Sequence, residues 1–325
     1  MSSLAEGETR YLDAINLALA TALDQDERVV LIGIDVGAGG GIFTVTRGLH
    51  ERFPDQIIDT PISEMGYVGA GVGAAMTGLR PIVEIMFMDF LGVCLDPIMN
   101  QAAKLPYMSG GALQVPIVFR TQTGAGRAAA AQHSQSLEAI VAHIPGLKVV
   151  LPGTVTDAHD LLLAAVDDPN PVVYIENRRL YGMKGRLGEA PLPLGRARVT
   201  KEGSDVTVIT WGQMLRECLK AASEVDVSLE VIDLRSLVPL DWDTIATSAT
   251  KTGRVLIVHE AVESFGPGAE LAAGVGERLF DLLRVPVRRL AMPSVPTPFA
   301  PSLEQALLPS ADSVAATCRE LVREG

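Results

Sequence analysis

Apolar and polar residues alternate along the chain with two different periods. Short continuous apolar runs such as residues 28–34 (RVVLIGI) have the length of strands that are buried on both faces. Between these runs, segments such as residues 10–24 place apolar residues at the spacing of amphipathic helices. Strands that alternate with helices in this way predict an α/β fold with parallel sheets covered by helices on both faces.

The alternation occurs twice and therefore predicts two domains. Between residues 182 and 204 it is interrupted by Gly, Pro and charged residues without a regular period, as is typical of a linker or an edge hairpin. We expect a first parallel-sheet domain over residues 1–185, a linker over 186–204 and a second parallel-sheet domain over 205–325. The expected elements that matter below are the strands 81–86 and 115–120 and the helices 46–53, 64–78, 92–107, 134–143 and 303–323.

Charge and cysteine usage narrow the class of protein. The formal net charge is −12, from 39 acidic and 27 basic residues, and a field of that sign repels nucleic-acid phosphates. The apolar runs are shorter than the ~20 residues of a membrane span, and the amino-terminal residues lack the pattern of a signal peptide. The three cysteines form no CxxC pair, which favours a reducing compartment. We expect a cytoplasmic protein that binds neither nucleic acid nor a membrane.

The segment DTPISEMGYVGAGVGAAMTG (59–78) is the first candidate for a functional site. It begins at the end of a strand, and Glu64 falls in the first turn of a helix that is rich in Gly and Ala. So many glycines weaken a helix, so another backbone or a ligand must approach it closely. Gly69 and Gly71 lie inside the helix rather than at a strand–helix turn, which disfavours a dinucleotide-binding fingerprint. For Glu64 alone, stabilisation of the helix dipole is the plain alternative to a functional role.

The second candidate is His133, which follows a Gly/Ala-rich loop after the strand 115–120. In open parallel sheets, ligands bind outside the carboxyl ends of the strands, where this loop lies. A histidine at such a place can exchange protons near neutral pH, and Ser134 is the expected cap of the helix that follows. A surface histidine near a helix end is the equally simple alternative.

Two further segments could contact a cofactor or an ion. Residues 84–111 are rich in Met and aromatic side chains, which either belong to the core or line a flat ring. In the second segment, residues 167–182, a turn precedes a buried strand. Its Asp and Asn residues are first of all turn formers, although backbone carbonyls in such a turn can also coordinate a monovalent cation.

The motifs together resemble the beta subunit of two-component, thiamine-diphosphate-dependent 2-oxo acid dehydrogenases, of the pyruvate or acetoin dehydrogenase type. The resemblance extends over essentially the whole chain and implies a pyrimidine-binding fold followed by a transketolase C-terminal-like domain. The segments that carry it, in order, are DTPISEMGYVGAGVGAA, AAKLPYMSGG, VPIVFR, AAAQHSQ, HIPGLKVVLP and NPVVYIENRRLYG.

The resemblance also implies roles for individual residues. Glu64 corresponds to the carboxylate that hydrogen-bonds the aminopyrimidine ring of the cofactor, and Phe90 and Met86 correspond to residues beside that ring. His133 corresponds to a histidine at the substrate entrance, suited to proton transfer or acyl transfer. The residues that match the family's potassium-binding loop are Ile117, Ala165, Val166, Asp168 and Asn170.

The resemblance further implies partners. The cofactor's diphosphate needs Mg²⁺ held by oxygen ligands, usually from a Gly-Asp-Gly segment, and the chain contains no such segment. An alpha subunit must therefore hold the diphosphate and Mg²⁺, in an assembly of two alpha and two beta chains. A lipoyl acyltransferase would accept the acyl group derived from the small-molecule substrate, and the glycine-rich helix is our candidate for a close subunit contact.

One position departs from the family pattern. The first strand usually ends Gly-Glu-Asp, whereas here it reads Gly33, Ile34, Asp35. The missing acid belongs to a series of carboxylates that links two active sites in the family, so we expect a proton relay through residue 34 to be interrupted.

Two other functions fit parts of the pattern. The carboxyl-terminal half of a split transketolase shares the two-domain plan, but its glutamate is usually followed by Gln, whereas Met65 follows Glu64 here. A chain kept for assembly alone would fit the loss at Ile34, but Glu64 and His133 argue against it.

Overall fold

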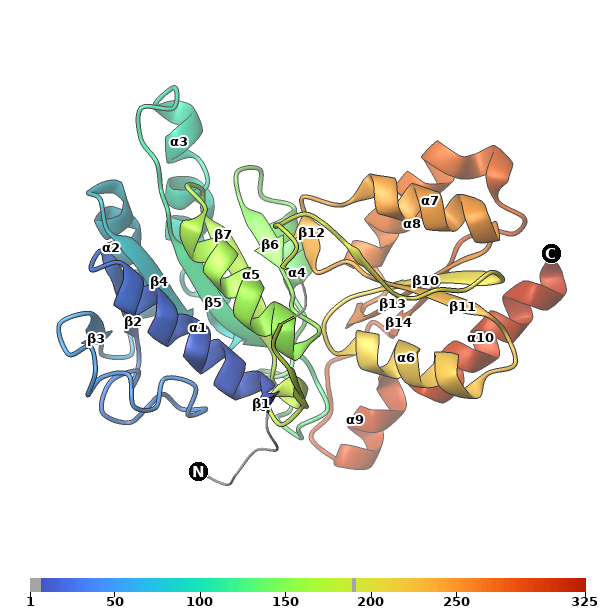
Figure 1. The fold of residues 1–325 in the computed structure, drawn as a ribbon, viewed down its shortest axis with the longest axis horizontal. Coiled ribbons are helices and arrows are strands. Elements are labelled where there is room, and N and C mark those ends of the chain that lie inside the picture. Colours follow the sequence, from blue (N-terminus) through green and yellow to red (C-terminus); the bar gives the residue numbers. More distant parts are fainter. Residues whose placement is uncertain (1–6, 189–190) are drawn as a thin grey trace. The chain divides into compact units, whose positions relative to one another are not determined.

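The computed structural model of the protein describes residues 7–188 and 191–325, and these form two compact units (Figure 1). The first unit contains the residues up to Thr123 and Ile140–Leu194, and the second contains Gly124–Ala139 and Gly195–Gly325. The segment Gly124–Ala139, which we expected within the first domain, groups with the second unit. No helix within the described residues is long and apolar enough to cross a membrane.

The first unit is built on a parallel sheet, in the strand order β6-β7-β5-β4-β2-β3. Every residue of β2, β5 and β7 is buried, as expected of a sheet with both faces covered. The strands are β2 (Val29–Gly33), β3 (Ile57–Asp59), β4 (Arg80–Ile85), β5 (Val118–Thr123), β6 (Lys148–Val150) and β7 (Val172–Asn177).

Helices cover this sheet, and a short antiparallel pair, β1 (Glu8–Arg10) with β8 (Lys184–Arg186), completes the unit. Helices α1 and α5 pack against each other, and α2 packs on β4 (Figure 1). The α-helices are α1 (Tyr11–Gln25), α2 (Glu64–Met76), α3 (Leu105–Met108) and α5 (Val155–Asp167), and a 3-10 helix spans Arg178–Leu180.

Two expected helices of this unit are wrong. Residues 92–107 do not form one helix but lie in a 3-10 helix (Met88–Gly92), a π-helix (Pro97–Ala102) and α3. Proline lacks an amide hydrogen and is favoured in the first turn, so each proline in this region begins a new short helix. Residues 46–53 form a series of turns, because Gly48 adopts φ +79° and interrupts the helical path.

The second unit contains another mostly parallel sheet, in the order β14-β13-β10-β11-β9, which confirms the expected α/β class. Residues Arg198–Lys201, within the expected linker, form β9 and pair antiparallel with β11 at the edge of the sheet. The other strands of this sheet are β10 (Val206–Thr210), β11 (Leu229–Asp233), β13 (Val255–Val262) and β14 (Arg288–Met292), and the short strand β12 (Ser236–Val238) is not part of it.

Helices of the second unit bury apolar residues that recur every three to four positions, and α6 packs against α10. The expected helix 303–323 is two helices, because Pro309 interrupts it and Ser310 caps the second with a reciprocal bond to Ser313. The helices are α6 (Met214–Glu224), α7 (Trp242–Thr252), α8 (Pro267–Leu279), α9 (Pro301–Leu307) and α10 (Ala311–Glu324), with a 3-10 helix at Phe280–Leu282; α4 (Glu138–Ala142) begins at the border of the two units.

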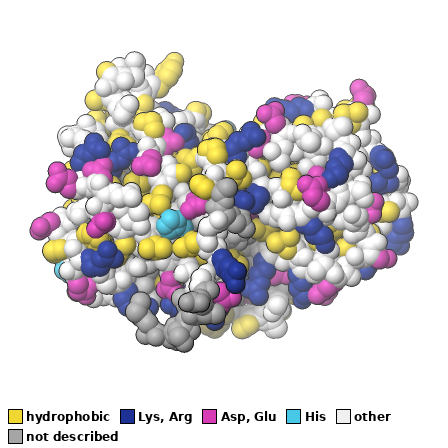
Figure 2. Space-filling view, viewed as in Figure 1, with side chains coloured by type: hydrophobic (Ala, Val, Ile, Leu, Met, Phe, Trp, Pro, Cys, Tyr) yellow, Lys and Arg dark blue, Asp and Glu magenta, His cyan; other side chains and the backbone are white. Residues whose placement is uncertain are grey.

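Surface charges of both signs are interspersed. On the face shown in Figure 2, Lys and Arg side chains alternate with Asp and Glu side chains over both units. The acidic excess of the chain is therefore not gathered into one patch on this face.

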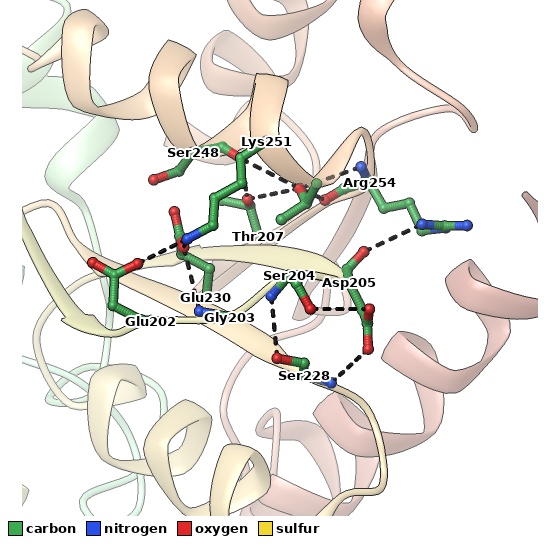
Figure 3. A network of polar contacts seen from close by, with 11 residues as sticks. Glu202, Gly203, Ser204, Asp205, Thr207, Ser228, Glu230, Ser248, Lys251 and Arg254 are labelled. Carbon is green, nitrogen blue, oxygen red and sulfur yellow. Dashed lines mark hydrogen bonds and ion pairs between the residues drawn. The ribbon is translucent and has the colours of Figure 1, made fainter.

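A network of polar contacts lies at the amino ends of β10 and β11 (Figure 3). Lys251, in the last turn of α7, contacts the carboxyl groups of Glu230 and Glu202, the latter at 2.8 Å. Arg254 donates to the backbone oxygens of Asp205 at 3.4 Å and Leu321 at 3.1 Å, which ties α10 to the sheet. Ligands of parallel sheets bind at the opposite, carboxyl ends of the strands, so this network is structural.

The network predicts a pH-dependent contribution of Glu230, whose side chain is 3% exposed. Burial opposes its ionisation, but hydrogen bonds from Lys251, Ser248 and Gly203 outweigh burial and lower its pKa. A group with a lowered pKa stabilises the fold above its unfolded pKa, and that stability is lost as the pH falls through the folded pKa. Glu230→Gln should therefore cost about 1 kcal/mol of unfolding free energy near neutral pH and progressively less below about pH 4.

Urea unfolding of the full chain at several pH values measures this difference. Glu202→Gln is the matched control, because Glu202 contacts the same lysine but its side chain is 79% exposed. A cost for Glu230→Gln that did not change with pH would contradict the assignment.

Candidate active site

Glu64 is the first residue of α2 and lies five residues after Asp59, the last residue of β3. Its side chain is buried, at 9% exposure. Among the described residues, its carboxyl group has no hydrogen-bond or ion-pair partner. A carboxyl group without a partner, on a side chain that is otherwise almost covered, can accept or share a proton with a ligand.

Two further polar side chains lie near Glu64, and sequence reasoning missed both. Tyr67, one helical turn later, is 5% exposed, and its buried hydroxyl has no hydrogen-bond partner among the described residues. Burial, and then the charges of Glu64 and neighbouring groups, raise the pKa of Tyr67. Burial and the charge of Glu64 likewise raise the pKa of Cys94 to about 12. The i, i+3 spacing on one helix face could have identified Tyr67 from the sequence.

The expected ring-lining residues Met86 and Phe90 follow the carboxyl end of β4, next to α2. Both are half-buried, and the Cys94 thiol lies 3.6 Å from the carbonyl oxygen of Phe90. The rings of Phe87 and Phe90 meet edge to face with centroids 6.0 Å apart, and Phe43 meets Phe87 in the same way at 5.3 Å. Burial and then the charge of Glu64 raise the pKa of Cys94, and Cys94 contacts Phe90, so Glu64 and Phe90 lie in one region.

A buried ionic cluster joins three neighbouring strands behind this region. The guanidinium of Arg120 (β5) contacts the carboxyl groups of Glu84 (β4) and Glu176 (β7), and all three side chains are almost fully buried. The Tyr181 hydroxyl donates to Glu176 at 2.6 Å. Burial opposes the charge of Arg120, but Glu176 and Glu84 outweigh burial and raise its pKa, so the guanidinium stays charged.

The glycines of α2 divide into two groups. A Cβ atom at Gly71 would lie 2.6 Å from the Val83 side chain, so close packing of the helix on β4 requires glycine there. Gly69 and Gly73 face open space, and packing within this unit does not explain them. The expected subunit contact through this helix stays a prediction.

His133 lies in the segment between β5 and α4 and is half-buried. The helix that follows begins at Glu138 rather than at residue 134, so the expected capping role of Ser134 is wrong. Ser134 is instead buried within an irregular stretch, because the segment is attached to the second unit by longer-range contacts. His133 and Glu64 therefore belong to different units.

The residues expected to bind potassium lie together at the amino ends of β5 and β7. The Asp168 side chain contacts Lys148 and accepts the Asn170 amide at 2.9 Å, which shapes the turn. Three backbone oxygens of this group accept a protein hydrogen bond: Ile117 from Val172, Ala165 from Asp168, and Val166 from Arg80. Because a carbonyl oxygen has two lone pairs, Ile117 and Ala165 can still offer one to a cation.

Comparisons with known proteins identify the two domains. Residues 8–184 match the family described as "Transketolase, pyrimidine binding domain", and residues 195–314 match "Transketolase, C-terminal domain". The fold is similar to that of a split-gene transketolase solved as an inactive beta4 tetramer (TM-score 0.79, 22% identity, covering 96% of this chain and 98% of that one).

Three relatives indicate the family more narrowly. The acetoin:2,6-dichlorophenolindophenol oxidoreductase subunit beta of Bacillus subtilis (strain 168) is 46% identical, with 96% of each chain covered. The 2-oxoisovalerate dehydrogenase subunit beta of the same organism is 44% identical (96% of this chain, 98% of that one). The pyruvate dehydrogenase E1 component subunit beta of Rhizobium meliloti (strain 1021) is 43% identical (94% and 69%).

The two matched domains define a transketolase-like protein. Within that class, the chain belongs to the family of beta subunits of acetoin, 2-oxoisovalerate and pyruvate dehydrogenases, which confirms the resemblance expected from its motifs.

The ionic cluster predicts a large effect of Arg120→Met. Removing the guanidinium leaves two buried carboxyl groups without a counter-charge, which should cost about 3–5 kcal/mol of unfolding free energy. Adding Glu84→Gln and Glu176→Gln to the same chain should restore most of that loss, because no uncompensated charge remains. Urea unfolding of the full chain measures both. Arg28→Met, which removes an exposed ion pair with Asp26, is the control and should change stability little.

Proposed function

We propose that this chain is the beta subunit of a thiamine-diphosphate-dependent dehydrogenase component. The component decarboxylates a pyruvate-like 2-oxo acid or cleaves acetoin, and it passes the acyl group to a lipoyl acyltransferase. The observation that carries the proposal is the carboxyl group of Glu64, which has no partner among the described residues although the residue is only 9% exposed, in a domain of the pyrimidine-binding family. The names of the relatives support the reaction class.

The residues around Glu64 fit the aminopyrimidine end of the cofactor. The Glu64 carboxyl group would share a proton with a ring nitrogen, and the half-buried side chains of Met86 and Phe90 would pack against the ring. The Tyr67 hydroxyl offers a further buried polar group on the same helix. When bound, the cofactor supplies a carbon nucleophile and an electron sink for the substrate carbonyl.

The remaining parts of the site would come from a partner chain. Because the sequence has no Gly-Asp-Gly segment, we propose that an alpha subunit binds the diphosphate and Mg²⁺, in an assembly of two alpha and two beta chains. Gly69 and Gly73, which face open space on α2, would allow close approach of a neighbouring chain. The three buried, free cysteines agree with a cytoplasmic location.

His133 would serve the later part of the reaction. A half-buried histidine can donate and accept protons near neutral pH, which suits it to substrate turnover or to acyl transfer onto the lipoyl group. The alternative function, the carboxyl-terminal half of a split transketolase, has a structural neighbour of similar fold, but the relatives at 42–46% identity are dehydrogenase subunits.

Reconstitution tests the proposal. The full chain is mixed with the alpha chain from the same organism, thiamine diphosphate and Mg²⁺, and 2-oxo acids and acetoin are assayed with lipoamide or with 2,6-dichlorophenolindophenol as acceptor. We expect acceptor reduction that needs both chains. Ketol transfer between sugars without acceptor reduction would support the split transketolase instead.

Glu64→Gln and Glu64→Ala should abolish turnover of the reconstituted enzyme, because neither side chain can share a proton with the ring nitrogen. A general acid–base group of this kind typically contributes 10²–10⁴-fold or so to the rate. Circular dichroism and thermal unfolding should show an intact fold. Glu51→Gln, at an exposed position, is the control. Near-normal turnover of Glu64→Gln would remove this residue from the mechanism.

We also propose that K⁺ binds at the turn formed by Ile117, Ala165, Val166, Asp168 and Asn170, mainly through backbone oxygens. A cation that binds only the folded state raises its stability by mass action. The thermal unfolding midpoint should therefore be higher in KCl than in NaCl or choline chloride of equal ionic strength. Equal midpoints in the three salts would count against the site.

A further inference from the structure

The segment that carries His133 adopts a conformation that it cannot hold by itself. Ala128 and Ala130 have φ values of +52° and +61°, in the left-handed region that non-glycine residues rarely adopt. Residues 134–137 have no regular secondary structure. Because such backbone conformations cost free energy, contacts from elsewhere in the protein must maintain them.

Glu304 supplies one of these contacts. It lies in α9, 176 positions away in the sequence, and one of its carboxyl oxygens accepts a hydrogen bond from the Ala128 amide at 2.8 Å. The side chain is 2% exposed, and its other carboxyl oxygen is buried without a partner among the described residues. Burying a carboxyl group with so few partners costs free energy. The hydrogen bond to Ala128 is the feature that explains why a glutamate occupies this buried position.

A second contact attaches the other end of the segment. The Trp211 indole N–H donates to the Glu138 carboxyl group at 3.3 Å. Both Glu138 and Glu304 belong to the second unit, as does the whole segment. Ala128 lies five residues before His133 and Glu138 five residues after it, so His133 is at the centre of a stretch that is held on both sides.

We propose that Glu304 is a positioning residue: its hydrogen bond to the Ala128 amide holds the segment in the conformation that presents the His133 imidazole for proton transfer. The functional part of this inference rests on the proposed role of His133. The anchoring part concerns the chain alone and can be tested without any activity.

Limited proteolysis with trypsin tests the anchor. Arg127 is exposed, and the bond that trypsin would cut, Arg127–Ala128, contains the amide that Glu304 holds. A protease needs this stretch to open, so the cleavage rate follows the open population. Glu304→Ala should raise cleavage at this bond about tenfold relative to cleavage elsewhere, the effect expected for loss of one hydrogen bond to a charged group.

Two variants control for loss of folding. Glu304→Gln keeps an oxygen that can accept from Ala128 and should be cleaved at a rate between the wild type and Glu304→Ala. Gln305→Ala changes the exposed neighbour on the same helix and should leave cleavage unchanged. If Glu304→Ala keeps its thermal unfolding midpoint and is cut at Arg127 no faster than the wild type, the anchor is refuted.

Turnover of the reconstituted complex tests the positioning role. Glu304→Ala should lower kcat with little change in KM, and Glu304→Gln should recover part of the loss. In a chain that already carries His133→Gln, Glu304→Ala should have no further effect, because both changes act on one group. Additive losses would show that Glu304 does not act through His133. Faster tryptic cleavage together with full activity of His133→Gln would support the anchor and refute the proposed role of His133, so the two failures are distinguishable.

Discussion

The contact of one buried guanidinium with two carboxyl groups underlies the arrangement of the first unit. Arg120 joins Glu84 and Glu176, and so connects β4, β5 and β7 near their carboxyl ends. A buried charge must be compensated, so these strands can slip relative to one another only at a large energetic cost. The register therefore determines where the residues that follow each strand lie.

The consequences extend to the candidate site. Two residues beyond Glu84, Met86 leaves the end of β4, and Phe87 and Phe90 follow it. Beyond β7, the Arg178 guanidinium lies over the Phe43 ring at 4.2 Å, and Phe43 in turn packs against Phe87. The rings of Phe43, Phe87 and Phe90 form an aromatic wall, which is thus supported from two strands that the ionic cluster holds together. A flat ligand that packs on such a wall meets side chains whose positions are already defined.

The second unit holds the segment that carries His133. The stretch with His133 follows β5 along the chain, and Glu304 and Trp211 of the second unit form hydrogen bonds with it. Ile34, which replaces the acidic residue of the family pattern, directly follows β2, and its side chain is buried. Because an apolar side chain cannot carry a proton, we expect a proton relay through this position to be interrupted. This expectation stays a prediction.

The sequence by itself determined the α/β class, the extents of α1 and α2 within about two residues, the family, and the place of Glu64 in the first turn of a helix. These features are local, because hydrophobic period, glycine content and motif spacing act over one or two turns or a single strand. The tertiary structure decided the rest. The helix expected at 92–107 is broken, and the one at 134–143 begins late. The partners of Arg120 lie 36 and 56 positions away in the sequence, and the partner of Ala128 lies 176 positions away. Which distant residues meet depends on the order of strands and on packing between elements, and no local pattern carries that information.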